Sequence, residues 1–409
     1  MKQEIISFED IKQFESRAEQ FHPIKWYKQM LLHEPISYNK ALNTWNVFKY
    51  DDVNRVLSDY EHFSGEGNRT TTAVKISEDN FSDNKVHLMT MDPPNNRKGR
   101  ALLASAFTPR SLTNWEPRIN QVAIDLIDQL IEGETIDVVQ SISTPLPTIV
   151  MSDLLGIPSP DIGLFKNWVD ILFMPFKKED ESAYELKKNT AIKEFFSYLY
   201  PIIVAKRSNL GDDIISDLIK AEVDGERLND KEIIEMTMAI LGAGMETTSH
   251  MISTTFYSLL YDDAKLYSEL RDQPDLIPNA VEEMLRFRFQ MGRRDRTVKK
   301  DHELFGVPMK KGDVVVAWLG AANVDEDMFE DSFMLNIHRA NNHKHLTFGK
   351  GAHFCLGAPL ARMELRIILE NFVKRFGGIE AVTPFNLESN LTDSATGQTL
   401  TYLPLKAYK

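Results

Sequence analysis

The sequence predicts a mainly α-helical protein with small β-sheets, folded as a single domain over residues 1–409. Three observations lead to this fold class. Apolar residues recur with helical spacing along most of the chain, whereas alternating strand patterns are few and short. No glycine-, proline- or serine-rich boundary divides the chain into parts. A chain of this length with 43% hydrophobic residues can bury a core deep enough to enclose a cofactor.

Helical patterns follow one another from the first quarter of the chain to near its end. They cover residues 51–59, 94–106, 113–132, 143–155, 160–172, 183–208, 212–222, 229–261, 264–272, 275–287 and 358–376. Strands are predicted as a hairpin at 35–50, in the stretch 302–318 and as a hairpin arm at 398–408. Because Gly306 and Gly312 mark turns ahead of a valine run, the second stretch reads as a turn-rich sheet segment.

Composition and charge exclude several classes of protein. A net charge of −13 argues against general nucleic-acid binding. One cysteine rules out an internal disulfide framework and a zinc cage, and it fits a reducing compartment. The charged N-terminus lacks the apolar core of a signal peptide. Glu246 and His250 interrupt the most apolar window, 236–260, so we expect a cytoplasmic protein with no membrane span.

The long helix predicted at 229–261 has an unusual centre. Asn229 and Glu232 form a capping-box pattern at its start, and its middle reads Gly-Ala-Gly-Met-Glu-Thr-Thr over residues 242–248. Two glycines cost about 1 kcal/mol each against alanine, so they must serve close packing or the approach of something flat. A buried carboxylate such as Glu246 is costly unless it is paired or useful. A packing groove with back-bonded threonines remains the structural alternative.

The only cysteine, Cys355, lies in the glycine-rich stretch "TFGKGAHFCLGAPLARMEL", residues 347–365. Gly351 and Gly357 allow a tight loop that aims backbone N–H groups at the sulfur. Pro359 suits the first turn of the helix that follows, and the dipole of that helix favours thiolate. A lone cysteine is usually a small buried hydrophobe. Here a single axial metal ligand fits the loop better than a nucleophile does.

These residues resemble the haem-binding loop of cytochromes P-450, Phe-x-x-Gly-x-x-x-Cys-x-Gly, at every fixed position. Other segments in the same order are also similar to the family, from about residue 35 to the end. They are "AGMETT" at 243–248, the Glu-x-x-Arg pair Glu283 and Arg286, Arg339 as their third partner, and "MDPPNNRKGRALLASAFTPR" at 91–110. The resemblance implies the P-450 fold, a single domain built around a buried haem.

The resemblance also implies the cofactor and its contacts. Haem b, iron protoporphyrin IX, would be bound through Cys355 as the proximal thiolate, which donates electron density to the iron. The residues expected at the haem are Cys355, Phe348, Gly351, Arg100, Arg296, His353, Asn96 and Ala243. Arg100, Arg296 and His353 would meet the propionates. Bacterial members commonly carry His in the segment Asp-Pro-Pro-x-His, where this chain has Asn96, which can donate a hydrogen bond but carries no charge.

Glu246 and Thr247 resemble the acid–alcohol pair of the family. Thr247 would hold O2 and an ordered water, Glu246 would supply protons, and the helix glycines would leave room for O2. Glu283 and Arg286 have a structural role in this interpretation and brace the segment on the cysteine side.

Substrate contacts are carried over at Met89, Ala239, Ala243, Gly292 and Ala395, and ordinary core packing is the alternative for each. Arg293 could turn inward to anchor a carboxylate. A solvated Arg293–Arg294 pair, or one bonded to a propionate, is the competing interpretation.

The sequence therefore predicts a monooxygenase that hydroxylates an apolar small molecule, with fatty acids, terpenoids and steroids all open. Because no flavin or iron–sulfur segment is present, electrons would come from NAD(P)H through a reductase and an acidic ferredoxin or flavodoxin. Basic residues near the cysteine side would attract that partner: Arg97, Lys98, Arg100, Arg110, Lys344, Lys350, Arg362 and Arg366. The alternatives are a haem-thiolate peroxygenase using H2O2 and a non-catalytic haem sensor or electron carrier.

Overall fold

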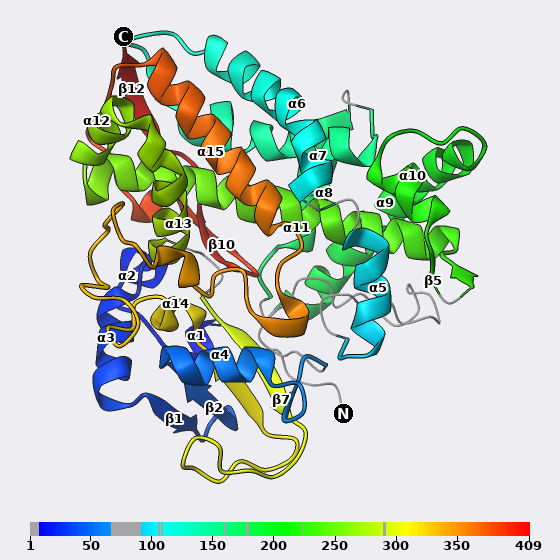
Figure 1. Cartoon of the computed structure of the whole chain (residues 1–409), viewed down its shortest axis with the longest axis vertical. Helices are drawn as coiled ribbons and strands as arrows, with labels where there is room; N and C mark the ends of the chain where they lie inside the picture. Colours follow the sequence, from blue (N-terminus) through cyan, green and yellow to red (C-terminus); the bar gives the residue numbers. More distant parts are fainter. Residues whose placement is uncertain are drawn as a thin grey trace.

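The computed structural model describes residues 8–66, 91–104, 107, 109–158, 161–176, 180–223, 225–288 and 292–409. Within them helices dominate and the sheets are small, which confirms the predicted fold class (Figure 1). The α-helices are α1 (Phe8–Ile11), α2 (Arg17–Phe21), α3 (Ile24–His33), α4 (Tyr50–Ser58), α5 (Asn95–Ala104), α6 (Pro109–Asp128), α7 (Pro145–Leu155), α8 (Ile162–Leu172), α9 (Glu181–Ser208), α10 (Ile214–Lys220), α11 (Asp230–Tyr257), α12 (Lys265–Asp272), α13 (Ile277–Phe287), α14 (Leu319–Ala322) and α15 (Ala358–Arg375).

Short helices and strands complete the chain. The π-helices are η2 (Val139–Ser143) and η5 (Ser258–Asp262), and the 3-10 helices are η6 (Pro274–Leu276), η7 (Asn342–Lys344), η8 (Gly351–His353) and η9 (Glu388–Asn390). The strands are β1 (Ile36–Asn39), β2 (Thr44–Val47), β3 (Phe63–Ser64), β4 (Thr135–Asp137), β5 (Glu222–Val223), β6 (Glu226–Arg227), β7 (Arg294–Val298), β8 (Val314–Ala317), β9 (Gly378–Ala381), β10 (Leu391–Ser394), β11 (Gly397–Leu400) and β12 (Pro404–Tyr408).

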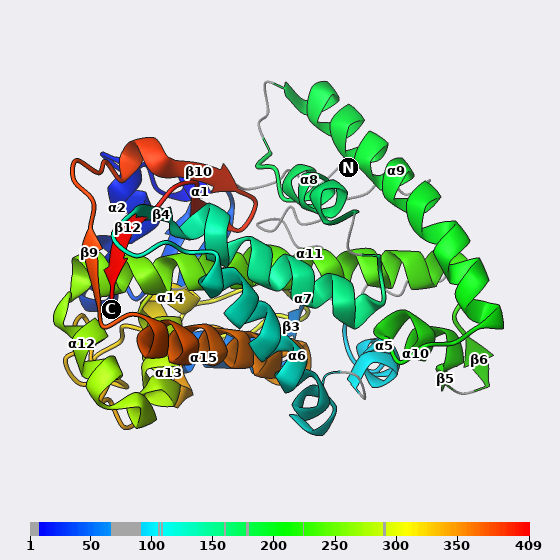
Figure 2. The ribbon, with the colours of Figure 1, turned by 90° about the horizontal axis from the view of Figure 1, so that it is seen from above.

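Helix α11 runs through the middle of the molecule and packs against α7, α8, α9, η2 and α15. Its start carries the predicted capping box, because Asn229 Oδ1 accepts from the Glu232 N–H at 2.9 Å and Glu232 accepts from the Asn229 N–H at 2.8 Å. Figure 2 shows α15 and α6 on one side of α11, and α8, α9 and β10 on the other. The central helix therefore separates two regions of the protein.

The sheets lie at the edges of this helical body. A five-stranded sheet has the order β1-β2-β8-β7-β3, a three-stranded sheet the order β4-β12-β9, and β10–β11 and β5–β6 form hairpins. In the first sheet β8 runs parallel to β2 and antiparallel to β7. Phe48 and Trp318, which directly follow β2 and β8, pack against Trp26 of α3. The ring centres of Trp318 and Phe48 are stacked 5.7 Å apart, and those of Trp318 and Trp26 are 4.8 Å apart in an edge-to-face arrangement.

Every helical pattern predicted from the sequence corresponds to a helix, with shifts of a few residues at the ends. Helix α3 was not predicted from the sequence, although Pro23 stands directly ahead of its first residue. The hairpin at 35–50 is confirmed as β1 and β2.

The strand predicted in the stretch 302–318 is confirmed, and the C-terminal strand prediction needs correction. The stretch 302–318 forms one strand, β8, after an isolated bridge between His302 and Met309. The C-terminal arm at 398–408 is two strands: β11 pairs with β10, while β12 pairs with β4 and β9. Pro404 begins β12, as expected for a residue that cannot donate to a strand ladder.

In the described part of the chain, no helix has both the length and the apolar character that a bilayer crossing requires.

Candidate active site

The loop that carries Cys355 is held by its own backbone. The Cys355 N–H donates to the Phe348 carbonyl at 2.9 Å, and the Phe354 N–H donates to the Gly351 carbonyl at 3.2 Å. Phe348 is buried, and the Arg362 guanidinium lies 4.6 Å from the centre of its ring. The loop is thus closed on one side by an aromatic ring capped by a cation.

The backbone conformation of this loop requires glycine at two positions, whereas it does not at a third. Gly349 and Gly351 have φ values of +72° and +66°, and a Cβ on Gly351 would come within 3.0 Å of Ser58 at the end of α4. Gly357, in contrast, has an ordinary φ of −78°. A Cβ there would lie 3.9 Å from the Cys355 sulfur, which is an ordinary contact distance, so neither backbone conformation nor space requires glycine at this position.

Cys355 is exposed, yet the protein surrounds it closely enough that desolvation raises the pKa of its thiol. The N–H groups of Gly357 and Ala358 donate hydrogen bonds to the sulfur, and Arg294 and Arg100 lie near it; these contacts oppose the rise in pKa. The expectation that loop N–H groups point at the sulfur is therefore confirmed.

A cluster of basic side chains lies beside the thiol. Arg100 comes from α5, Arg294 and Arg296 from one face of β7, and His353 from η8. Burial lowers the pKa of each guanidinium, that of Arg294 to about 10, and desolvation together with Arg296 lowers the pKa of His353 to about 4.

Asp92 and Asp295 are the acidic groups that act on this cluster, and Asp92 also pairs with Lys299. Among the described residues, three guanidiniums thus face two shared carboxylates, and His353 Nδ1 is buried without a hydrogen-bond partner. A buried excess of positive charge is stabilised by an anion. The two propionates of a haem would supply that anion, so the residues present fit the group that the resemblance implies.

Helix α5 is tied directly to the cysteine loop. The buried Asn96 donates from Nδ2 to the Ala352 carbonyl at 3.1 Å, and Arg100 donates to the Phe354 carbonyl at 2.6 Å. Asn96 Oδ1 is buried with no partner among the described residues. Asn96, which was expected at the haem, uses its donor to fasten α5 to the loop on which the thiol lies.

Ala239, Ala243 and Thr247 share one face of α11, because they are spaced by four residues. Ala243 is exposed and the other two are half-buried, although the helix is central. The Thr247 hydroxyl donates to the Ala243 carbonyl at 2.7 Å. This is the back-bond of the structural alternative, and it leaves the hydroxyl oxygen free to accept a hydrogen bond.

The helix glycines do not leave the room for O2 that was expected. A Cβ on Gly242 would come within 2.9 Å of Phe173, and one on Gly244 within 2.6 Å of the Met151 sulfur. Phe173, directly after α8, fills the space at Gly242, and Met151 of α7 fills the space at Gly244. The packing-groove interpretation is therefore the correct one for this pair, and α11 continues through it as one helix.

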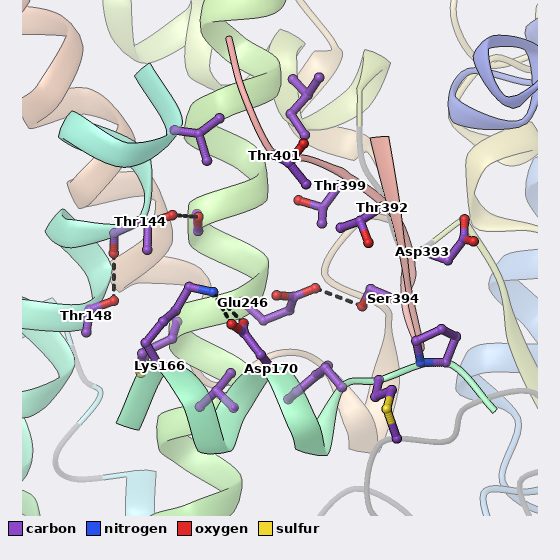
Figure 3. A pocket seen from close by; sticks show the side chains of 18 of the residues that line it. Thr144, Thr148, Lys166, Asp170, Glu246, Thr392, Asp393, Ser394, Thr399 and Thr401 are labelled. Atoms are coloured by element: carbon purple, nitrogen blue, oxygen red, sulfur yellow. Dashed lines mark hydrogen bonds and ion pairs between the residues drawn. The ribbon is translucent and has the colours of Figure 1, made fainter. Parts of the chain in front are cut away.

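Glu246 faces a different space from Thr247. Successive residues of a helix are turned by about 100°, and Glu246 lines a cavity of about 800 Å3 between α11, α8, α9, η2 and the β10–β11 hairpin (Figure 3). Its Oε1 accepts a hydrogen bond from Ser394 Oγ at 2.8 Å. The predicted pair is thus adjacent in sequence but divided between two faces of α11.

The candidate substrate residues lie in several places. Met89 lies outside the described residues. Gly292 packs against the Tyr27 hydroxyl, which a Cβ would meet at 2.7 Å, and the Ala395 N–H donates to the Phe173 carbonyl at 2.7 Å. None of these four residues lines the 800 Å3 cavity: Gly292, Ala395, Ala239 and Ala243.

Arg293 does not point toward the thiol as an inward anchor would. It lines a cavity of about 50 Å3 with Tyr27 and Trp318, and its guanidinium lies 5.9 Å from the Trp318 ring. Its neighbour Arg294 is the one whose charge acts on Cys355. The sequence indicated Arg294 only as part of an Arg293–Arg294 pair that is solvated or bonded to a propionate; its two-residue spacing from Arg296 places both arginines on one face of β7.

Glu283, Arg286 and Arg339 form a buried brace, as predicted. Arg286 Nη2 lies 2.7 Å from Glu283 Oε1, and Arg339 Nε lies 3.3 Å from the same oxygen. Arg286 also donates to the backbone carbonyls of Asn323, Ser332 and Met334, and Arg339 donates to those of Glu330, Asp331 and Met334. This brace holds the irregular segment that leads into the cysteine loop.

Comparison with known proteins agrees with these observations. The family model "Cytochrome P450" matches residues 8–383. "Cytochrome P450(MEG)" of Priestia megaterium is 58% identical over 405 residues, covering 99% of each chain. CYP109E1 from Bacillus megaterium, solved in complex with corticosterone, is 36% identical with a TM-score of 0.83 and covers 95% of this chain and 99% of its own. The same protein in complex with testosterone is 35% identical with a TM-score of 0.84, over 96% and 99% of the two chains.

Proposed function

The chain belongs to the cytochrome P450 family of haem-thiolate monooxygenases, and on that premise we propose that it hydroxylates an apolar molecule of steroid size. One oxygen atom of O2 enters the substrate and the other leaves as water: RH + O2 + NAD(P)H + H+ gives ROH + H2O + NAD(P)+. The observation that carries the proposal is the single accessible thiol of Cys355, which lies beside the guanidinium groups of Arg294 and Arg100.

The proposed cofactor is haem b, bound through the Cys355 sulfur. When bound, its thiolate-ligated iron supplies the activation of O2. The N–H groups of Gly357 and Ala358 moderate electron donation from the sulfur, and buried Phe348 keeps water from it. Arg100, Arg294, Arg296 and His353 would hold the propionates, and Gly351 would allow the tight turn of the loop that carries the thiol.

Thr247 and Glu246 are proposed to manage protons. The Thr247 hydroxyl donates its proton to the Ala243 carbonyl. Its oxygen can therefore accept a hydrogen bond from a protonated group in the active site. Glu246, the next residue, would replace protons consumed in the reaction.

The proposed substrate class draws on the steroid-bound structures of CYP109E1. Ala239 and Ala243 would give a flat ring system room against α11, since neither side chain extends beyond a methyl group. Met89, Gly292 and Ala395 are the further contacts proposed from the family pattern. A rigid, apolar ligand loses little entropy when it is bound in such a site.

Spectral titration tests this proposal. Corticosterone and testosterone should displace the iron-bound water of the purified holoenzyme and shift its Soret band at micromolar concentration. A fatty acid of similar carbon number serves as the comparison ligand. If only the fatty acid produces the shift, the steroid proposal is wrong and the monooxygenase assignment stands.

The proposed electron donor is an acidic ferredoxin or flavodoxin served by an NAD(P)H reductase. The positive surface expected for it is smaller than the sequence suggested, because Arg362 pairs with Glu282 and Arg366 pairs with Glu116 and Glu370. Arg97, Lys344 and Lys350 remain exposed, and the side chains of Lys98 and Arg110 lie outside the described residues.

The double variant Lys344→Glu, Lys350→Glu should slow ferredoxin-driven reduction at low salt by severalfold, with less effect near 0.1 M salt, where charges are screened over about 10 Å. Lys25→Glu on α3, an exposed lysine on a different element, is the control. Equal rates for the double variant and the control would place the docking surface elsewhere.

A further inference from the structure

The carboxyl of Glu246 is bound by a residue 148 positions away in the sequence. Ser394 Oγ donates to Glu246 Oε1 at 2.8 Å, and Figure 3 shows the two side chains pointing toward each other across the cavity edge. Glu246 lies on α11, the helix that also carries Thr247, whereas Ser394 ends β10. A long-range contact therefore determines where the proposed acid of the reaction lies.

The hairpin holds the Ser394 hydroxyl in a defined orientation. Ser394 pairs with Gly397 across the turn, and the Thr396 N–H donates to Ser394 Oγ at 3.3 Å. The Thr396 hydroxyl lies 3.1 Å from Ser394 Oγ and must donate to it, because the one proton of Ser394 is given to Glu246. The Ala395 N–H fastens the same turn to the Phe173 carbonyl at 2.7 Å. The hydroxyl thus has its acceptor and donor roles assigned by the fold.

The cavity beside Glu246 reaches the protein surface. Its lining includes Lys166 and Asp170, an ion pair whose side chains are 41% and 52% exposed. Hydroxyl groups make up much of the remaining wall: Thr144, Thr148, Ser249, Thr392, Ser394, Thr399 and Thr401. Water and hydroxyls conduct protons, and a carboxyl at the inner wall can exchange protons with them. Glu246 therefore lies between a route from solvent and the helix turn that carries Thr247.

We propose that Ser394 is a positioning residue for Glu246, and that the β10–β11 hairpin keeps this carboxyl at the wall of the hydroxyl-lined cavity, through which protons for the reaction arrive. This inference rests on the proposed function of Glu246. A proton taken from solvent binds the carboxylate and is then given toward the Thr247 side; no electron moves in this step, and the next solvent proton restores the acid. Ser394 touches neither substrate nor cofactor in this account.

The test compares four changes in the holoenzyme: Ser394→Ala, Ser394→Thr, Glu246→Gln and the double variant Ser394→Ala, Glu246→Gln. The quantity measured is product formed per NAD(P)H consumed, with H2O2 as the competing product. Ser394→Ala should lower this ratio about two- to tenfold, the factor that corresponds to one hydrogen bond. Ser394→Thr keeps the hydroxyl and should restore most of the ratio. Ser389→Ala, an exposed serine of the adjoining η9, is the matched control and should match wild type.

The double variant separates positioning from general damage to the hairpin. If Ser394 acts through Glu246, the double variant should be no worse than Glu246→Gln alone. Additive losses, or an equal loss in Ser389→Ala, would overturn the inference. Normal coupling in Ser394→Ala with impaired coupling in Glu246→Gln would also overturn it, while the proposed function stands. Normal coupling in Glu246→Gln would instead contradict the proposed role of Glu246.

A second measurement does not depend on turnover. Amide hydrogen exchange at residues 394–397 reports how firmly the turn is held. Ser394→Ala and Glu246→Gln should each speed this exchange, and the double variant should add nothing further. Exchange that is unchanged in both single variants would show that the contact does not hold the hairpin, and the inference would fail.

Discussion

The cysteine loop and the cavity beside the β10–β11 hairpin are built in different ways. The loop is defined by nearby residues: Phe348, Gly351 and Cys355 lie within eight positions, and their backbone bonds close on one another. The cavity is assembled from η2, α8, α9, α11 and the hairpin, which span more than half of the chain. Figure 2 shows the helix after the loop, α15, and the hairpin strand β10 on different sides of α11.

This difference separates a rigid part of the protein from an adaptable part. The cysteine side carries a fully buried ionic brace, Glu283 and Arg286, whose removal leaves charge without compensation. The cavity side is lined by exposed ion pairs and hydroxyls that can change without a large cost in stability. We therefore expect changes on the first side to abolish folding or cofactor chemistry, and changes on the second to alter how efficiently electrons are used.

The largest expected effect is at Cys355. Cys355→His should still bind haem, but it should lose the strongly red-shifted Soret band of the reduced CO complex and essentially all monooxygenase activity, because imidazole donates less electron density than thiolate. Absorption spectra of the reduced CO complex measure this directly. A variant that keeps both band and activity would show that another residue is the ligand.

The brace should be the next most sensitive point. Glu283→Gln removes the only carboxylate between Arg286 and Arg339 in the described structure, and it should lower the free energy of unfolding by about 3–5 kcal/mol. Glu370→Gln on α15 removes the carboxylate of a partly exposed ion pair with Arg366, so it should cost less than about 1 kcal/mol. Urea unfolding followed by circular dichroism gives both values. Equal costs would remove the contrast between rigid and adaptable regions.

Glu364 on α15 tests the same side through pH. Its carboxyl is fully buried with no hydrogen-bond partner among the described residues, and burial raises its pKa to about 8. The folded state therefore holds a proton that the unfolded state releases above its ordinary pKa of 4.5, so stability falls as pH rises from about 4.5 to 8 and then levels off.

Glu364→Gln should flatten this dependence and raise stability at pH 8 by on the order of a few kcal/mol. Unfolding titrations at pH 5, 6.5 and 8 measure it, with Glu370→Gln as the control on the same helix. An unchanged slope in Glu364→Gln would mean that the carboxyl does not titrate in this window.

The smallest effect is expected at Thr247, at the border of the two regions. Thr247→Val removes the hydroxyl but keeps the shape, and it should raise H2O2 formed per NAD(P)H about two- to tenfold at nearly constant stability. Thr255→Val is the matched control, because Thr255 donates to the Met251 carbonyl at 2.7 Å in the same way on the same helix. If both variants couple normally, the Thr247 hydroxyl serves only its own helix.

The sequence by itself determined the helical fold class and the local parts of the site. Glycines at 349 and 351 adopt left-handed conformations that their residue type allows, and the capping box of α11 needs only residues 229–232. The spacing of Glu283 and Arg286 on one helix likewise predicts their pairing. These features depend on neighbours in the chain, so periodicity and residue type are sufficient to predict them.

Only the tertiary structure decided which side chains meet across long distances. It brought Met151 and Phe173 into the spaces at Gly244 and Gly242, turned Arg294 rather than Arg293 toward the thiol, and joined Ser394 to Glu246. Neither hydrophobic period nor motif encodes such contacts, because they depend on the packing of α11 against α7, α8 and a hairpin near the C-terminus. A hydrogen bond between residues 148 positions apart exists only after close packing has fixed both backbones.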